Sequence, residues 1–242
     1  MTTEIRRIER AITCVDDERA ELQTERQAFR ELREFLRSTQ PVSTTHKGAP
    51  AAHTVAQSPG STAGFVDAYR RTVMEVDHYE SHYGESLEEN VAMELGSEIA
   101  TAIRANAELN PLLHWQLQVA IAGSLRRRSR LLEVLDDERN SLRTAIEDCR
   151  TLDRRLEGVP ERRISDMVFD ELECHWNRLS DLKDCCEQLI RSRQQFIAER
   201  RTSGLDLDDH VSFNDYLYGT FESRFPVLET GLELLDRIDN HR

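Results

Sequence analysis

A seven-residue apolar repeat near the start of the chain constrains the fold more than any other feature. Its members follow one another at intervals of seven residues: Ile8, Val15, Leu22, Phe29 and Leu36. The companion column, three residues earlier, begins with isoleucine and continues with arginine: Ile5, Ile12, Arg19, Arg26 and Arg33. Two such columns form the contact face of a coiled-coil helix. Residues 3–39 are therefore predicted to form one long amphipathic helix.

The arginines of the companion column allow two interpretations. Their aliphatic stems can cover the apolar column while their guanidinium groups reach carboxylates such as Glu18 and Glu25, which directly precede two of them. Alternatively, half-buried arginines can fix the register and select the partner helix, as polar core residues do in zippers. We favour the first interpretation.

The same pattern recurs later in the chain. Residues 135–142 nearly copy residues 15–22, and residues 189–196 resemble residues 22–29. Recurring faces of this kind predict long helices that pair with one another or with another chain. The residues expected to form this interaction seam are Val15, Arg19, Leu22, Arg26, Phe29, Leu135, Arg139, Leu142, Leu189, Arg193 and Phe196.

The chain is predicted to be all-α, with a long N-terminal helix and a helical bundle that contains coiled-coil-like long helices. Residues 1–39 form the amphipathic helix, residues 40–64 a flexible linker rich in Ser, Thr, Ala, Pro and Gly, and residues 65–240 the bundle.

Apolar spacing and the Gly and Pro positions predict five bundle helices. A short helix runs past Val73 to Val76, and a second runs from Ser86 to the Asn110-Pro111 pair. Two long helices follow, from Pro111 to Gly158 and from Pro160 to about Arg201. A last helix extends to about Asp239, with a kink at Pro226.

The charge balance indicates an unusual environment. The net charge is −13, and nearly all basic residues are arginine, since lysine occurs only at positions 47 and 183. An acidic, lysine-poor surface is typical of proteins from extremely salt-loving archaea, where carboxylates keep a protein hydrated in screened solution. The N-terminus lacks an apolar signal core, and the longest apolar run is too short and polar to cross a bilayer. A cytoplasmic protein is expected.

The five cysteines are odd in number and show no Cys-x-x-Cys spacing, so we interpret them mainly as small core residues rather than as a disulfide framework. A metal site that joins Cys174-His175 to Cys185-Cys186 across a helix pair is disfavoured, because adjacent cysteines chelate one tetrahedral ion poorly. A core histidine is the preferred interpretation of His175.

Between Phe65 and Leu142 the sequence resembles an uncharacterised domain family of haloarchaea. The similarity rests on residues 68–74, on His78-Tyr79 with Tyr83-Gly84-Glu85, on 94–96, and on two later segments at 217–219 and 224–228. That family has no assigned chemistry. The resemblance therefore implies a helical fold and a salt-loving host, and it transfers no site residue.

One cluster has the residue types of a metal site: Glu75, His78, His82 and Glu85. On a single helix these side chains would share one face, and imidazole with carboxylate suits zinc or iron. Gly84 is expected to end the helix before Glu85, and no second half-site accompanies the cluster. We prefer a polar helix end packed over tyrosines, and we expect no cofactor.

Residues 126–130, Arg-Arg-Arg-Ser-Arg, form the one basic cluster and suggest a contact to phosphate or nucleic acid. Against this, carboxylates at Glu133, Asp136, Asp137 and Glu138 follow on the same helix and can neutralise it. Phosphate-binding loops, nucleophile elbows and paired acids are absent from the sequence.

The sequence therefore favours a non-catalytic interaction or scaffold protein that pairs with itself or with a helical partner through its seams. A nucleic-acid-associated or regulatory protein that uses Arg126–Arg130 is the alternative. A metal-dependent protein that uses His78 and His82 ranks third.

Overall fold

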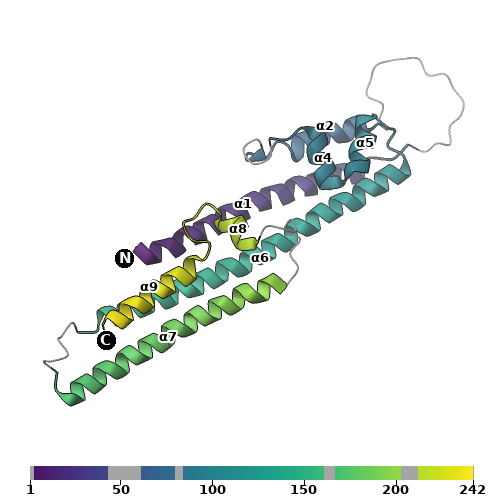
Figure 1. Cartoon of the computed structure of the whole chain (residues 1–242). Coiled ribbons are helices and arrows are strands. Elements are labelled where there is room, and N and C mark those ends of the chain that lie inside the picture. Colours follow the sequence, from purple (N-terminus) through teal and green to yellow (C-terminus); the bar gives the residue numbers. More distant parts are fainter. Residues whose placement is uncertain (1–2, 43–60, 80–83, 161–166, 203–211, 242) are drawn as a thin grey trace, which may run out of the picture. The chain divides into compact units, whose positions relative to one another are not determined.

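The computed structural model describes residues 3–42, 61–79, 84–160, 167–202 and 212–241, and these form helices with a single isolated bridge between Ser61 and Glu108. The predicted all-α fold and its long N-terminal helix are confirmed (Figure 1). The helices are α1 (Thr3–Ser38), α2 (Thr62–Thr72), α4 (Leu87–Leu95), α5 (Ser97–Arg104), α6 (Pro111–Glu157), α7 (Phe169–Thr202), α8 (Phe213–Tyr218) and α9 (Pro226–Asn240).

Contacts group the chain into two compact units. Unit 1 comprises Met1–Glu18 and Val134–Arg242, and unit 2 comprises Arg19–Glu133. The long helices α1 and α6 each contribute to both units. Whether the predicted segments 1–39, 40–64 and 65–240 fold as separate domains stays a prediction. Most of the predicted linker, residues 43–60, lies outside the described residues.

Unit 1 contains the first half of α1, the second half of α6, and α7, α8 and α9. Its helices α7 and α9 pack closely against each other. Ion pairs join the others: Arg7 of α1 makes two hydrogen bonds of 3.0 and 3.1 Å to Glu233 of α9. Arg150 of α6 donates to Glu9 of α1 at 2.7 Å. The apolar repeat of α1 supplies the buried side chains Ile8 and Val15 to this unit.

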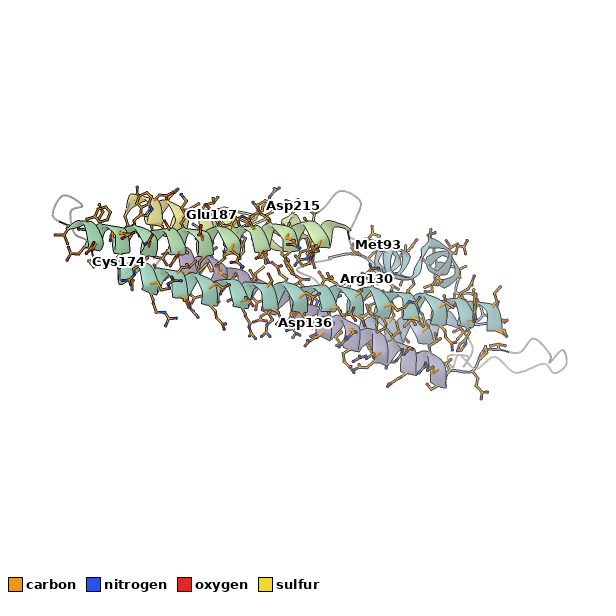
Figure 2. The ribbon with its side chains drawn as sticks, turned by 90° about the horizontal axis from the view of Figure 1, so that it is seen from below. Met93, Arg130, Asp136, Cys174, Glu187 and Asp215 are labelled. Carbon is orange, nitrogen blue, oxygen red and sulfur yellow. The ribbon has the colours of Figure 1, made fainter. Side chains whose placement is uncertain are left out.

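Unit 2 has one apolar core, built from the second half of α1, the first half of α6, and α2, α4 and α5. Its largest buried side chains include Phe29, Phe65 and Tyr69, and Tyr69 lies edge-on to Phe29 with ring centroids 6.4 Å apart. The Tyr69 hydroxyl donates to Asn90 Oδ1 at 2.6 Å, which satisfies a buried polar group. Met93 of α4 lies on the outside of this core and is exposed (Figure 2).

The long helix α6 has the predicted limits because its ends carry stop and start signals. Asn110 accepts a hydrogen bond from the Leu113 backbone at 2.9 Å, and Pro111 occupies the first turn of α6, where its missing N–H costs nothing. The helix α6 ends at Glu157, directly before Gly158.

Four features of the predicted helices are wrong. The second long helix, α7, begins at Phe169 and not at Pro160, since Met167 and Val168 before it are not helical. The predicted helix from Ser86 to Asn110 is broken into α4 and α5 by Gly96, whose φ of +107° no helix interior permits. The helix α2 ends at Thr72, before Val76. The last predicted helix is two helices, because Pro226 begins α9 instead of kinking one continuous helix.

The close packing of α7 and α9 depends on Gly231. A Cβ atom added there would lie 2.8 Å from Ile190 Cγ1, and the Gly231 carbonyl accepts the Cys186 thiol at 3.2 Å. Gly231→Ala is therefore expected to lower the free energy of unfolding by about 1–3 kcal/mol, although alanine is the better helix former. Urea unfolding followed by circular dichroism measures the change. Adding Ile190→Ala, which removes the clashing atom, should recover part of the loss, and equal stability of Gly231→Ala and the wild type would contradict the argument.

Candidate interaction site

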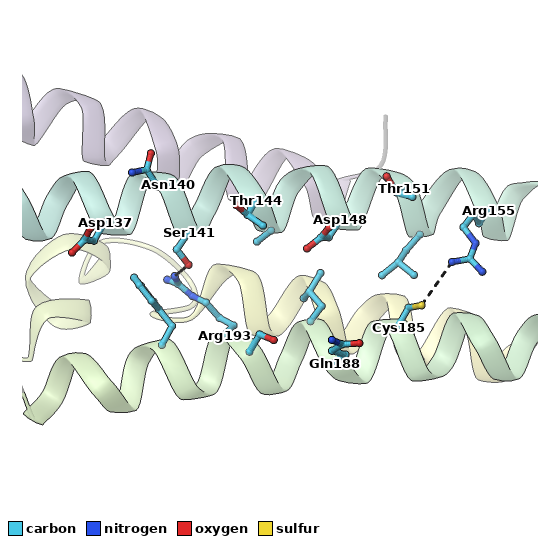
Figure 3. Close-up of a pocket in the computed structure, with 15 residues that line it drawn as sticks. Asp137, Asn140, Ser141, Thr144, Asp148, Thr151, Arg155, Cys185, Gln188 and Arg193 are labelled. Atoms are coloured by element: carbon cyan, nitrogen blue, oxygen red, sulfur yellow. Dashed lines mark hydrogen bonds between the residues drawn. The ribbon is translucent and has the colours of Figure 1, made fainter.

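A long groove runs between α6 and α7 in unit 1, with a volume of about 710 Å³ (Figure 3). Apolar side chains form its floor: Ala145, Leu152, Leu189 and Phe196. Polar side chains border it, and several of them are exposed, so the groove is open to solvent along its length: Asn140, Thr144, Gln188 and Ser192. On α6 it extends from Asp137 to Arg155, about 27 Å at 1.5 Å per residue.

The charged groups of the groove are unevenly placed. Asp137 and Asp148 border it on α6 and point toward α7 (Figure 3). Partial burial, together with the neighbouring Glu147, raises the pKa of the Asp148 carboxyl. Arg155 lies at the other end, where its Nη1 is 3.8 Å from Cys185 Sγ. Arg193 lines the groove near Asp137, but it is buried and paired with Glu138. The exposed charges of the groove are therefore carboxylates at one end and in the middle, and the Arg155 guanidinium group at the other end.

A buried charge cluster anchors the acidic end. Glu138 is fully buried, and it accepts hydrogen bonds from Arg193 at 2.6 Å, Arg200 at 2.5 Å and the Tyr218 hydroxyl at 2.5 Å. Arg193 also donates to Ser141 in the groove wall at 2.8 Å. Because these groups come from α6, α7 and α8, the cluster fixes the two groove helices against each other.

The pKa values follow from this arrangement. Burial alone would raise the pKa of Glu138, but Arg193, Arg200 and the Tyr218 hydrogen bond outweigh it and hold that pKa below its usual range. Burial raises the pKa of Tyr218, and the Glu138 carboxylate raises it further. Glu138 is thus an ionised hydrogen-bond acceptor in a site without water access.

The seam residues predicted from the sequence lie mostly inside the chain. Of the eleven, the apolar ones on α1 and α6 are all buried: Val15, Leu22, Phe29, Leu135 and Leu142. Leu189 and Arg193 are also buried, Phe196 is half-buried, and Arg19 and Arg26 are half-buried along α1. Arg139 donates from Nε to Asp16 on α1 at 2.5 Å. Pairing between chains through these seams stays a prediction, and in the structure their apolar side chains contact the chain itself.

The arginines of the seam differ in their contacts. Arg139 and Arg193 bond carboxylates on neighbouring helices. On α1, the Nε atoms of Arg26 and Arg33 are buried without a hydrogen-bond partner, and Glu25 bonds His78 and Arg128. For the arginines of α1 both interpretations stay predictions.

The basic cluster at Arg126–Arg130 is divided between the interior and the surface of unit 2. Arg128 is buried, donating to Glu25 at 2.9 Å and to Glu94 at 2.7 and 3.0 Å. Arg127 also bonds Glu94. The expected neutralisation by Glu138 is wrong, because Glu138 is buried against Arg193 and Arg200. A contact to phosphate would have to use those arginines of the cluster whose side chains are exposed on the surface.

The candidate metal residues that the structure describes, Glu75, His78 and Glu85, do not share a helix face. The helix α2 ends at Thr72, so Glu75 and His78 follow it in turns, and Glu75 is exposed. His78 lies 3.1 Å from Glu25, and Glu85 accepts from Asn90 at 3.2 Å. His82 lies outside the described residues. Within the described part of the chain, no three His, Cys, Asp or Glu side chains gather as a metal site requires.

The cysteines are free thiols, of which Cys149 and Cys186 are buried in unit 1 and Cys185 borders the groove. His175 is half-buried with its Nε2 3.3 Å from the His241 carbonyl. No helix in the described ranges has the length and apolar character needed to cross a bilayer.

Sequence reasoning missed the groove and the burial of Glu138. The alternation of small and polar residues along Asn140, Thr144 and Thr151 was a signal, because it marks an α6 face that no large apolar side chain covers. The depth of the groove depends on how α7 packs beside α6, and the local sequence of α6 does not reveal that packing.

Comparison with known proteins places the chain in a family without assigned chemistry. Comparison with curated proteins and with solved structures found no match. A family model described as domain of unknown function (DUF7260) matches residues 6–242, nearly the whole chain. The chain therefore belongs to the DUF7260 family of domains of unknown function.

Proposed function

We propose that this protein is a non-catalytic helical interaction protein whose binding site is the groove between α6 and α7. The groove itself is the observation that carries the proposal. It has an apolar floor, a polar border and a length of about five helical turns. Those are the properties of grooves that accept an amphipathic helix.

The shape favours a helix over a small molecule. Small-molecule sites enclose most of their ligand's surface, whereas this groove is bordered by exposed side chains along its length. Its acids are not an acid–base pair for catalysis either, since Asp137 and Asp148 lie eleven residues apart on one helix, about 16 Å. A scaffold role agrees with the buried cluster at Glu138, which holds both groove helices in place.

A photo-crosslinking experiment tests the proposal. The full chain carries benzoylphenylalanine at Thr144 inside the groove or, as a matched control, at Arg143, an exposed neighbour on α6 that does not line the groove. After irradiation in a native extract, mass spectrometry should map crosslinks from Thr144 to one helical segment, with few from Arg143. Ser192→Trp, which fills the groove, should abolish them. Equal crosslinking from both positions, or none from Thr144, would count against a groove site.

A further inference from the structure

The outer face of α6 in unit 2 carries an unusual row of exposed apolar side chains. Leu112 is 63% exposed, Trp115 59% and Val119 47%. Their spacing of three and four residues places them on one side of the helix, opposite the buried Leu117 and Ile121. Arg126, two turns further on, continues the same side and is exposed. We call Leu112, Trp115, Val119 and Arg126 the Trp115 stripe.

We infer that the α6–α7 groove is occupied by the Trp115 stripe of a second copy of this chain. The inference rests on the proposed function, since it names the helix that the groove accepts. The two surfaces differ, so the contact is heterologous: the stripe of one copy meets the groove of another.

The apolar positions of the two surfaces have the same spacing. Leu112 and Val119 are seven residues apart on the stripe, and Ala145 and Leu152 are seven apart on the groove floor. When the incoming helix runs antiparallel to α6, Leu112 can lie beside Leu152 and Val119 beside Ala145. Trp115 then lies between them.

The surroundings of Trp115 in this alignment suit an indole ring. Asp148 borders the groove at that level and can accept the indole N–H, while Leu189 of α7 offers an apolar surface beneath the ring. Tryptophan is also one of the residue types enriched among the side chains that contribute most to binding at the centre of protein interfaces.

The charges of the stripe and of the groove favour one direction for the incoming helix. In the antiparallel alignment Arg126, seven residues beyond Val119, reaches Asp137, eight residues before Ala145. The parallel alignment would instead carry Arg126 past Leu152 and Arg155 to the end of α6, far from Asp137. The opposite charges of Arg126 and Asp137 therefore favour the antiparallel pairing.

Charge also distinguishes the stripe from another exposed aromatic surface, at the start of α7. Phe169 and Trp176 at the start of α7 are exposed as well, but Asp170, Glu171 and Glu173 surround them. Those carboxylates would face Asp137 and Asp148 in the groove. The Trp115 stripe, with Arg126, is the complementary surface.

Two single-surface variants of the full chain test the inference by sedimentation velocity. Trp115→Asp disables the stripe and Ser192→Trp fills the groove. The wild type should form species at multiples of 28.0 kDa as its concentration rises. Neither variant should self-associate at those concentrations, with dissociation constants raised at least about tenfold. A mixture of the two should form a one-to-one dimer, because each retains the surface that the other lacks.

Matched controls separate this contact from other pairings. Trp176→Asp removes the other exposed tryptophan and should leave association unchanged. Arg126→Glu and Asp137→Arg should each weaken association, and the chain carrying both should recover it, since the charge pair is then reversed. Circular dichroism of every variant verifies folding, which these exposed positions should not disturb.

The outcomes distinguish the inference from the proposed function. A monomeric wild type, a mixture that stays monomeric, or a Trp176→Asp variant that alone dissociates would overturn the inference. If Thr144 nevertheless crosslinks to a helix of another protein, the groove remains an interaction site with a different occupant. If Thr144 crosslinks to nothing, both fail.

Discussion

Glu138→Ala is expected to lower the free energy of unfolding by about 3–5 kcal/mol. The substitution leaves the guanidinium groups of Arg193 and Arg200 buried without the carboxylate that both bond at 2.5–2.6 Å. It also removes the acceptor of the buried Tyr218 hydroxyl. Such a loss is larger than that of an exposed ion pair because the remaining charges cannot regain water.

Urea unfolding followed by circular dichroism, at one fixed salt concentration, measures this effect. Glu147→Ala is the matched control: it removes an exposed carboxylate from the same helix and should change stability by less than about 0.5 kcal/mol. Replacing Glu138, Arg193 and Arg200 together by methionine should cost less than Glu138→Ala alone, because no buried charge is left unpaired. If Glu138→Ala behaved like the control, the cluster would not be buried as described.

The pH dependence has a definite sign. The folded-state pKa of Glu138 is below its ordinary value, so its ion pairs contribute stability above the unfolded pKa, about 4.3, and that contribution is lost as pH falls through the folded pKa. Wild-type stability should therefore fall in acid more steeply than that of the triple methionine variant. Parallel acid-unfolding curves would argue that Glu138 makes no such contribution.

Arg128→Ala is expected to have an effect of the same size in unit 2, about 3–5 kcal/mol. Arg128 bridges Glu25 of α1 and Glu94 of α4, and its guanidinium carbon lies 4.3 Å from the centre of the Phe29 ring. Without it, two largely buried carboxylates face each other, and an aromatic ring loses its cover.

Arg70→Ala, which removes an exposed arginine of α2 in the same unit, is the control and should change stability by less than about 0.5 kcal/mol. Burial favours the neutral form of Glu94, but Arg128 outweighs it and lowers the Glu94 pKa in the wild type. That contribution disappears as pH falls and Glu94 becomes protonated. The difference between Arg128→Ala and wild type should therefore be smaller at pH 4 than at pH 7, and a difference that grew in acid would contradict the bridge.

The helices of this chain were predictable because their signals are local. The seven-residue repeat from Ile8 to Leu36 set both the length and the buried face of α1, and Pro111 and Gly158 marked the limits of α6. A helix depends on residues a few positions apart, so spacing and end signals are visible in the sequence. Local signals failed at Gly96, where a positive φ broke an otherwise continuous apolar pattern.

Only the tertiary structure decided what the helix faces contact. Glu138 and Arg139 are adjacent in a sequence of charged residues, yet Glu138 is buried against arginines 55 and 62 residues away, while Arg139 reaches Asp16 on α1. In the same way the Arg126–Arg130 cluster was divided between core and surface by Glu25 and Glu94. Periodicity determines which side of a helix is apolar, but the free energy of burying a charge depends on partners brought together by folding. The sequence by itself therefore determined the helices and their apolar faces, whereas the tertiary structure alone decided which charges are buried and where the groove opens.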